Sequence, residues 1–248
     1  MKQLVAFDLD GTLAESKQAI GPDMAEALCD LLSVAHVAVI SGGDWPQFEK
    51  QVASRLPPHA DLSRLWLMPT TGTKLFVHRD GAWSTVYAEL FDADERARII
   101  AAFNASLEAT GLQPEESWGE RIEDRGSQIT FSALGQQAPI SAKETWDPDF
   151  AKRKVIQADL RTRLPGLAIN MGGATSIDIT REGVDKGYGL KRLRDHSGIA
   201  LDDMLFIGDA IFPGGNDYPA KEIGLDTVRV RDPEDTLNVI AAIVACQK

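Results

Sequence analysis

Three short apolar runs, each ending abruptly at a polar residue and glycine, constrain the fold of this chain most. They are "LVAFDLDG" at residues 4–11, "VAVISGGD" at 37–44 and "MLFIGDA" at 204–210, with a weaker candidate, "DTVRV", at 226–230. Continuous runs of Val, Ile, Leu and Phe are typical of strands buried on both faces, as in a parallel sheet. We therefore expect a parallel sheet with helices on both sides.

Amphipathic segments separate these runs. Residues 21–33, 44–56 and 186–198 carry apolar side chains at helical spacing. Strands that alternate with helices predict right-handed crossovers and a doubly wound, Rossmann-like α/β core. In such a core the ligand crevice lies at the carboxyl ends of the strands. Four polar residues follow the strands directly and are expected to meet there: Asp8, Asp10, Ser41 and Asp209.

The middle of the chain has a different pattern. Residues 95–111 and 149–166 have helical periodicity, while residues 127–134 alternate apolar and polar side chains, as a half-buried strand does. Residues 167–180 contain two further candidate strands. This pattern predicts an inserted α+β cap domain with an antiparallel sheet.

The cap is expected to begin after the "HRDGAW" turn and to end near Gly183. The predicted organisation is thus a first core part at residues 1–82, a cap at 83–183 and a second core part at 184–248.

Composition excludes some classes of protein. With 44% hydrophobic and 25% charged residues, the chain resembles an ordinary globular protein. A formal net charge of −11 argues against a nucleic-acid partner, which needs a basic surface. No apolar run predicts a membrane span or a signal peptide. The two cysteines, Cys29 and Cys246, have no metal or redox spacing, so we expect a cytoplasmic protein.

Four motifs, taken in order, resemble those of the haloacid dehalogenase superfamily of phosphotransferases. They are "DLDGTL", "VISGGD", Lys186 in "GVDKGYGL", and "GDAIFPGGND". Each is weak alone, but their order and their positions at strand ends make the match specific. The inserted domain resembles the cap of subfamily IIB, which contains sugar-phosphate phosphatases and eukaryotic phosphomannomutases. The resemblance to phosphomannomutases covers nearly the whole chain. It implies a Mg²⁺-dependent enzyme with a small sugar phosphate as substrate, and it is compatible with a homodimer formed through the cap.

The resemblance assigns the chemistry to the first and fourth motifs. A phosphate monoester is a dianion, so a divalent cation must screen it from a carboxylate nucleophile. Asp8 would attack phosphorus to form an aspartyl-phosphate, and Asp10 would act as general acid and then as general base. Mg²⁺ prefers oxygen ligands and would bind Asp8, the backbone carbonyl of Asp10, and Asp209.

The second and third motifs would hold the phosphoryl group. Ser41 would donate a hydrogen bond and Lys186 would supply charge, with Gly42 also assigned to substrate binding. Taken alone, Ser41 would suit a helix N-cap and Lys186 an exposed surface. Asn216 and Asp217 would support Lys186 and the waters on the metal.

The cap would recognise the sugar. By resemblance, Arg125 would pair with an oxyanion, while Ser176 and Asp178 would bind sugar hydroxyls. From the sequence alone, the latter two are equally compatible with outward-facing strand residues.

Three positions depart from the mutases of the family, which have arginines where this chain has Lys17, Gln136 and Lys143. Lys17 and Lys143 remain candidate substrate ligands, but a lysine lacks the bidentate fork of arginine, and Gln136 carries no charge. The second phosphate of a bisphosphorylated sugar would therefore be held weakly. These departures favour a phosphatase over a phosphomannomutase. A non-catalytic sugar-phosphate sensor is a third, weaker alternative, because the carboxylates and the lysine of the motifs are all present.

Overall fold

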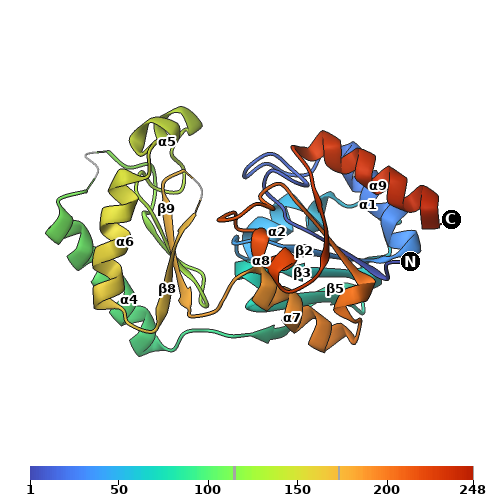
Figure 1. Cartoon of the computed structure of the whole chain (residues 1–248), viewed down its shortest axis with the longest axis horizontal. Coiled ribbons are helices and arrows are strands. Elements are labelled where there is room, and N and C mark those ends of the chain that lie inside the picture. Colours follow the sequence, from blue (N-terminus) through green and yellow to red (C-terminus); the bar gives the residue numbers. More distant parts are fainter. Residues whose placement is uncertain (114–115, 173, 248) are drawn as a thin grey trace. The chain divides into compact units, whose positions relative to one another are not determined.

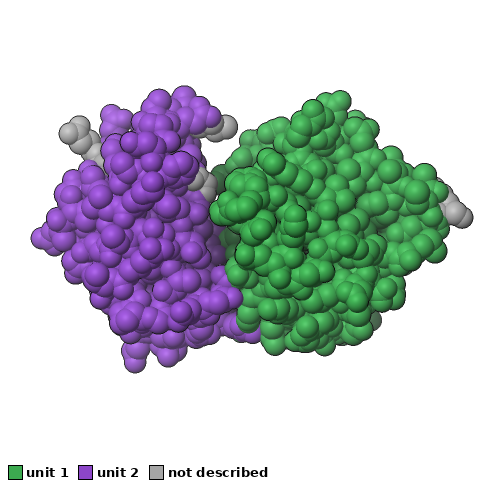
Figure 2. Space-filling view, viewed as in Figure 1, with its two compact units in different colours: residues 1–88, 185–248 green, residues 89–184 purple. Residues whose placement is uncertain are grey.

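The computed structural model describes residues 1–113, 116–172 and 174–247. The chain forms two compact units (Figure 1; Figure 2). Unit 1 comprises residues 1–88 and 185–248, and unit 2 comprises residues 89–184. Unit 2 is therefore an insertion into unit 1. Within the described ranges, no helix combines the length and the apolar character that crossing a membrane would require.

Unit 1 is built on a seven-stranded sheet with the order β11-β10-β1-β2-β3-β4-β5. The first five strands in this order are parallel, β4 is antiparallel to β3, and β5 is antiparallel to β4. The strands are β1 Leu4–Phe7, β2 His36–Ile40, β3 Leu65–Met68, β4 Lys74–Arg79, β5 Ala82–Ala88, β10 Met204–Gly208 and β11 Asp226–Arg229.

Helices cover both faces of this sheet. The longer ones are α1 Pro22–Val34, α2 Trp45–Gln51, α7 Lys186–Ser197 and α9 Pro233–Gln247; the short ones are α3 Pro69–Gly72, α8 Tyr218–Glu222 and the 3₁₀ turns η1 Ala53–Arg55, η2 Leu62–Arg64 and η3 Leu201–Asp203. Along β1, Val5 and Phe7 join the core on the side of α1 and α9, whereas Leu4 and Ala6 join the core on the side of α7. Successive strand residues point to opposite faces. The doubly wound core is confirmed.

Unit 2 contains a four-stranded antiparallel sheet with the order β6-β7-β9-β8. The strands are β6 Ile122–Asp124, β7 Ile129–Ser132, β8 Leu167–Gly172 and β9 Ser176–Arg181, and the helices are α4 Ala93–Thr110, α5 Ile140–Trp146 and α6 Ala151–Arg163. The apolar faces of α4 and α6 pack with Phe131, Ile177 and Ile179 of the sheet. Polar residues occupy the other face of these strands. The expected α+β insertion is therefore present.

The predicted start of the cap at residue 83 is wrong. Trp83 lies in β5, where it pairs with His78 of β4, and the chain leaves unit 1 only after residue 88. Asp80 and Gly81 both have positive φ, at 52° and 78°, as in a tight hairpin turn that keeps the next strand in the same sheet. The second boundary lies one residue beyond the predicted one, after residue 184.

The second predicted helix is shorter than the periodicity indicated. We expected it over residues 44–56, but α2 ends at Gln51, and a 3₁₀ turn follows at Ala53–Arg55. Val52, at φ −123° and ψ −65°, has left the helical conformation.

Candidate active site

Three neighbouring parallel strands deliver the first, second and fourth motifs to one edge of the unit 1 sheet. β1 lies between β10 and β2, with Phe7 opposite Ile207 and Val39. Asp8 follows β1 directly, Ser41 follows β2 and Asp209 follows β10. Because the carboxyl ends of parallel strands meet at the same edge, the structure brings these residues together as the sequence predicted.

Lys186 connects this edge to the start of α7. It is the first helical residue, next to the N-cap Asp185, and its Nζ donates to Asp8 Oδ1 at 2.5 Å and to Asp217 Oδ1. The backbone N–H of Ala210 donates to the other oxygen of Asp217 at 3.0 Å, which fixes that carboxylate. Lys186, Asp8 and Asp217 are 2%, 3% and 0% exposed, so the ammonium and both carboxylates are removed from bulk water.

The electrostatics of this cluster follow from burial and like charge. Burial raises the pKa of Asp8 to about 7, although Lys186 opposes the shift. Burial and the charge of Asp217 also raise the pKa of Asp209. Burial alone would lower the pKa of Lys186, but Asp8 and Asp217 outweigh it and raise that pKa. Carboxylates held this close favour a bound cation.

The residues present fit a magnesium ion. Carboxylate oxygens of Asp8, Asp209 and Asp217 lie within 4.8 Å of one another. Gly11 has a φ of +85°, and a Cβ there would stand 2.8 Å from Asp209 Oδ2, so only glycine leaves this carboxylate its space. The N–H of Asp209 also donates to Thr12 Oγ1 at 3.1 Å. An all-oxygen set of this kind matches the preference of Mg²⁺.

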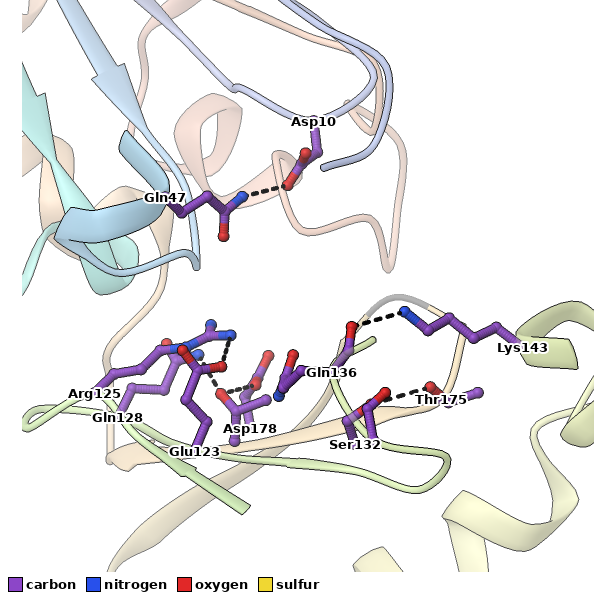
Figure 3. A network of polar contacts seen from close by, with 12 residues as sticks. Asp10, Gln47, Glu123, Arg125, Gln128, Ser132, Gln136, Lys143, Thr175 and Asp178 are labelled. Carbon is purple, nitrogen blue, oxygen red and sulfur yellow. Dashed lines mark hydrogen bonds and ion pairs between the residues drawn. The ribbon is translucent and has the colours of Figure 1, made fainter. Parts of the chain in front are cut away.

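The carboxylate of Asp10 is held by different groups. Its Oδ1 accepts the backbone N–H of Lys17 at 2.6 Å, and its Oδ2 accepts Gln47 Nε2 at 3.3 Å (Figure 3). Gln47 was not predicted, because a single polar residue on α2 has no distinguishing sequence pattern. Lys17 itself is exposed and has a positive φ of 61°. The backbone N–H of Lys17 therefore orients Asp10, the candidate general acid. No pattern in the sequence predicted this contact.

The loop of the second motif is supported from behind by α3. The carbonyl of Ser41 accepts the N–H of Thr71 at 2.9 Å, and the carbonyl of Gly43 accepts that of Thr70 at 2.8 Å. Both threonines have positive φ, at 59° and 49°, which is unfavourable for a β-branched residue. Ser41 is 5% exposed and Gly42 is partly buried within this fixed loop. The loop is therefore a rigid element at the same sheet edge.

Asn216 was predicted, with Asp217, to support Lys186 and the waters on the metal. It is exposed in the loop that precedes Asp217, whereas Asp217 is fully buried.

Unit 2 carries its own polar cluster (Figure 3). Thr130 and Asp178 alternate with Phe131, Ile177 and Ile179, so they lie on the sheet face that α4 and α6 do not cover. Arg125 lies between β6 and β7 and donates to Glu123 Oε2 at 2.7 Å. Thr130 Oγ1 donates to Asp178 Oδ1 at 2.7 Å, and Gln128 donates to Thr130 at 3.0 Å. Burial raises the pKa of Asp178, although Arg125 and the hydrogen bonds oppose it. Glu123, Gln128 and Thr130 were not predicted, since their role appears only when the strands pair.

The other candidate ligands of unit 2 lie near this cluster. Ser176 stands opposite Ser132 in the β7–β9 pairing, two residues from Asp178 and on the same strand face. Lys143, on α5, donates to the carbonyl of Gln136 at 3.4 Å (Figure 3). The structure thus gathers Arg125, Asp178, Gln136 and Lys143 within one unit.

Comparisons with known proteins agree with the fold and identify the family. The family model of eukaryotic phosphomannomutase matches residues 24–246. The phosphomannomutase of Spinacia oleracea is 26% identical, over 99% of this chain and 97% of that protein. A C-terminally truncated IMP-nucleotidase from Plasmodium falciparum matches the structure at a TM-score of 0.71, with 17% identity over 100% of this chain and 72% of that one. A haloacid dehalogenase-like hydrolase from Bacteroides thetaiotaomicron gives a TM-score of 0.67, with 14% identity over 98% and 100% of the two chains. The chain therefore belongs to the eukaryotic phosphomannomutase family and is a phosphotransferase of the haloacid dehalogenase superfamily.

Proposed function

We propose that this phosphotransferase is a Mg²⁺-dependent sugar-phosphate phosphatase in which Asp8 carries the phosphoryl group. The observation that carries the proposal is the cluster around Lys186, whose ammonium contacts Asp8 and Asp217 while Asp209 lies close to both carboxylates. Three carboxylates around one ammonium leave an excess of negative charge. Asp8, Asp209 and the Asp10 carbonyl would hold Mg²⁺, which would supply the positive charge that lets a phosphate dianion approach.

In the first step, a carboxylate oxygen of Asp8 forms a bond to phosphorus, and the bond from phosphorus to the sugar oxygen breaks. Asp10 gives its proton to that leaving oxygen. In the second step, Asp10 removes a proton from water, whose oxygen attacks phosphorus and breaks the bond to Asp8. Phosphate leaves, and both aspartates return to their starting state.

Ser41 and Lys186 bind the equatorial phosphoryl oxygens during both steps. The fixed loop around Ser41 and the buried position of Lys186 support this role, because preorganised donors lower the barrier without reorganising. Gly42 offers its backbone to the same group.

Unit 2 recognises the sugar in this proposal. Arg125 pairs with an oxyanion of the substrate, and Ser176 and Asp178 bind hydroxyl groups. The buried carboxyl of Asp178 supports this role, because a hydroxyl donor compensates the cost of its desolvation.

Charge in unit 2 favours hydrolysis over phosphoryl return to the sugar. A mutase must hold the phosphate that is not reacting, which needs several cations. In the cluster of Figure 3, Arg125 already faces Glu123 and Asp178, and the neighbouring Gln136 is neutral. Lys143 of unit 2 is a point charge without the fork that fixes a phosphate, and the same holds for Lys17 of unit 1.

Phosphomannomutase activity is the second candidate, and the family match over residues 24–246 favours it. One incubation separates the two functions. With mannose or glucose 1-phosphate, Mg²⁺ and a trace of the 1,6-bisphosphate, we expect inorganic phosphate to form faster than the 6-phosphate. Accumulation of the 6-phosphate with little free phosphate would identify a mutase. A cytoplasmic location and a homodimer through the cap stay predictions.

The covalent step has its own test. Beryllium fluoride, which mimics a phosphoryl group, should bind in the presence of Mg²⁺, and mass spectrometry of a rapidly quenched reaction with substrate should place phosphate on the peptide that contains Asp8. Modification of another residue would overturn the assignment. The sensor alternative predicts ligand binding that persists without any turnover.

A further inference from the structure

Helix α1 and the loop before η2 bring together three side chains of different ligand chemistry, none of which belongs to the active site. The ligand atoms of Glu26, Cys29 and His59 lie within 4.8 Å of one another. His59 Nε2 is already 3.3 Å from Glu26 Oε2. We propose that these three residues form a second metal site, selective for Zn²⁺ or a similar borderline cation.

Two of the ligands are presented by one rigid helix. Glu26 and Cys29 are three residues apart on α1, so their side chains lie on the same helix face. The opposite face is fixed in the core of unit 1, where Met24, Ala25 and Leu28 are buried. The spacing of Glu26 and Cys29 is therefore set by a packed element.

The third ligand comes from a hydrogen-bonded turn. The N–H of Ala60 donates to the carbonyl of Pro57 at 3.0 Å, and Asp61 caps η2 by accepting the N–H of Ser63 at 3.2 Å. Ala60 and Leu62 pack against the core of unit 1. His59 is thus held at a defined position beside α1.

The ligand types select the ion. Thiolate, imidazole and carboxylate are the common ligands of Zn²⁺, and bonds of about 2.0–2.3 Å at tetrahedral angles imply ligand separations of about 3.5 Å. His59 Nε2 and Glu26 Oε2, at 3.3 Å, are already near that separation, and all three ligand atoms lie within 4.8 Å of one another. Three protein ligands leave a fourth position for water. The all-oxygen cluster at Asp8 instead suits Mg²⁺, so the two sites would separate the two metals.

Charge at the site supports cation binding. Burial and the neighbouring carboxylates of Glu26 and Asp30 raise the pKa of the Cys29 thiol, because they disfavour another negative charge. A bound divalent cation reverses this effect and takes the place of the thiol proton. Binding would link α1 to the turn that carries His59 and would stabilise unit 1 by mass action.

Cobalt tests the site without reference to turnover. The full chain, with Mg²⁺ in excess, is titrated first with Co²⁺, and Zn²⁺ is then added to the cobalt-loaded sample. We expect a thiolate-to-cobalt charge-transfer band that Zn²⁺ abolishes by displacing Co²⁺. The carboxylate cluster at Asp8 contains no sulfur, so metal bound there does not produce this band. Absence of the band in the wild-type chain overturns the proposal.

Cysteine variants provide the matched control. The band should disappear in Cys29→Ser and persist in Cys246→Ser, which removes the exposed second cysteine. Glu26→Gln and His59→Ala should each weaken Zn²⁺ binding at least about tenfold. Metal-free circular dichroism should match the wild type in each variant, since Glu26 and His59 are exposed. A band that follows Cys246, or Zn²⁺ affinity that is unchanged in His59→Ala, shows that the site does not exist.

Discussion

The polar clusters of unit 1 and unit 2 each combine a cationic side chain with carboxylates, but they are assembled differently. In unit 1, Lys186 contacts Asp8, which is 178 residues away in the sequence, and both are buried. In unit 2, Arg125 contacts Glu123, only two residues away and 37% exposed at its side chain. The Lys186–Asp8 pair depends on the topology of a whole sheet, whereas the Arg125–Glu123 pair depends on one hairpin. We therefore expect changes in unit 1 to affect turnover and stability, and changes in unit 2 to affect substrate preference.

The largest effect should come from Asp8→Asn. An amide is a poor nucleophile toward phosphorus, so the rate of phosphate release should fall at least about 10⁴-fold. Phosphate release from p-nitrophenyl phosphate with Mg²⁺ measures this. Asp23→Asn, an exposed aspartate of α1, is the matched control and should retain wild-type activity. Appreciable turnover in Asp8→Asn would remove Asp8 from the nucleophile role.

Asp10→Asn should follow, with a loss of about 10²–10⁴-fold in rate, the usual contribution of a general acid. The loss should shrink for esters with acidic leaving groups, because these need no proton from Asp10. Rates for alkyl and aryl phosphates, compared in the same variant, provide the measurement. Gln47→Ala should show a weaker form of the same dependence, since Gln47 only orients the carboxylate. Equal losses for all leaving groups would contradict the acid role.

Lys186→Met tests the buried half of the comparison through stability. It leaves Asp8 and Asp217 buried without their cation, which should lower the free energy of unfolding by about 3–5 kcal/mol. Urea unfolding in the absence of Mg²⁺ measures this. The double variant Lys186→Met with Asp217→Leu should recover part of the loss. In unit 2, Arg125→Ala should lower the free energy of unfolding by less, because water can solvate the partly exposed Glu123. Equal costs would remove the contrast between the clusters.

Arg125→Ala should instead change specificity. We expect the Michaelis constant for hexose phosphates to rise about tenfold, as for the loss of one charge-assisted contact, with little change for p-nitrophenyl phosphate. Arg96→Ala, which removes a partly exposed arginine paired with Asp124 in the same unit, is the control. Equal damage to both substrates would place Arg125 outside the specificity site.

Gln136→Arg should have the smallest effect, a shift of a few-fold in product ratio toward the 6-phosphate. The added guanidinium gives unit 2 a forked phosphate ligand that retains the sugar. The sugar should then react with the aspartyl-phosphate before water does in a larger share of turnovers. The ratio of 6-phosphate to inorganic phosphate measures the shift, with Gln137→Arg at the exposed neighbouring position as the control. An unchanged ratio would show that Gln136 does not control the partition.

The sequence by itself determined four of the five parallel core strands and the edge at which the motifs meet, whereas β3 at Leu65–Met68 was not predicted. A continuous apolar run specifies a doubly buried strand locally, and parallel strands necessarily place Asp8, Ser41 and Asp209 at the same edge. The inserted α+β unit was also predictable, because its helical and alternating periods are local properties of the chain.

Only the tertiary structure decided the partners of these residues. The hairpin at Asp80 and Gly81 kept β5 in the core sheet, although the same residues are typical of a joint between domains. The contacts of Gln47 with Asp10 and of Thr130 with Asp178 span 37 and 48 residues. Contacts over such separations depend on how whole elements pack, and a local pattern of polarity carries no information about that packing.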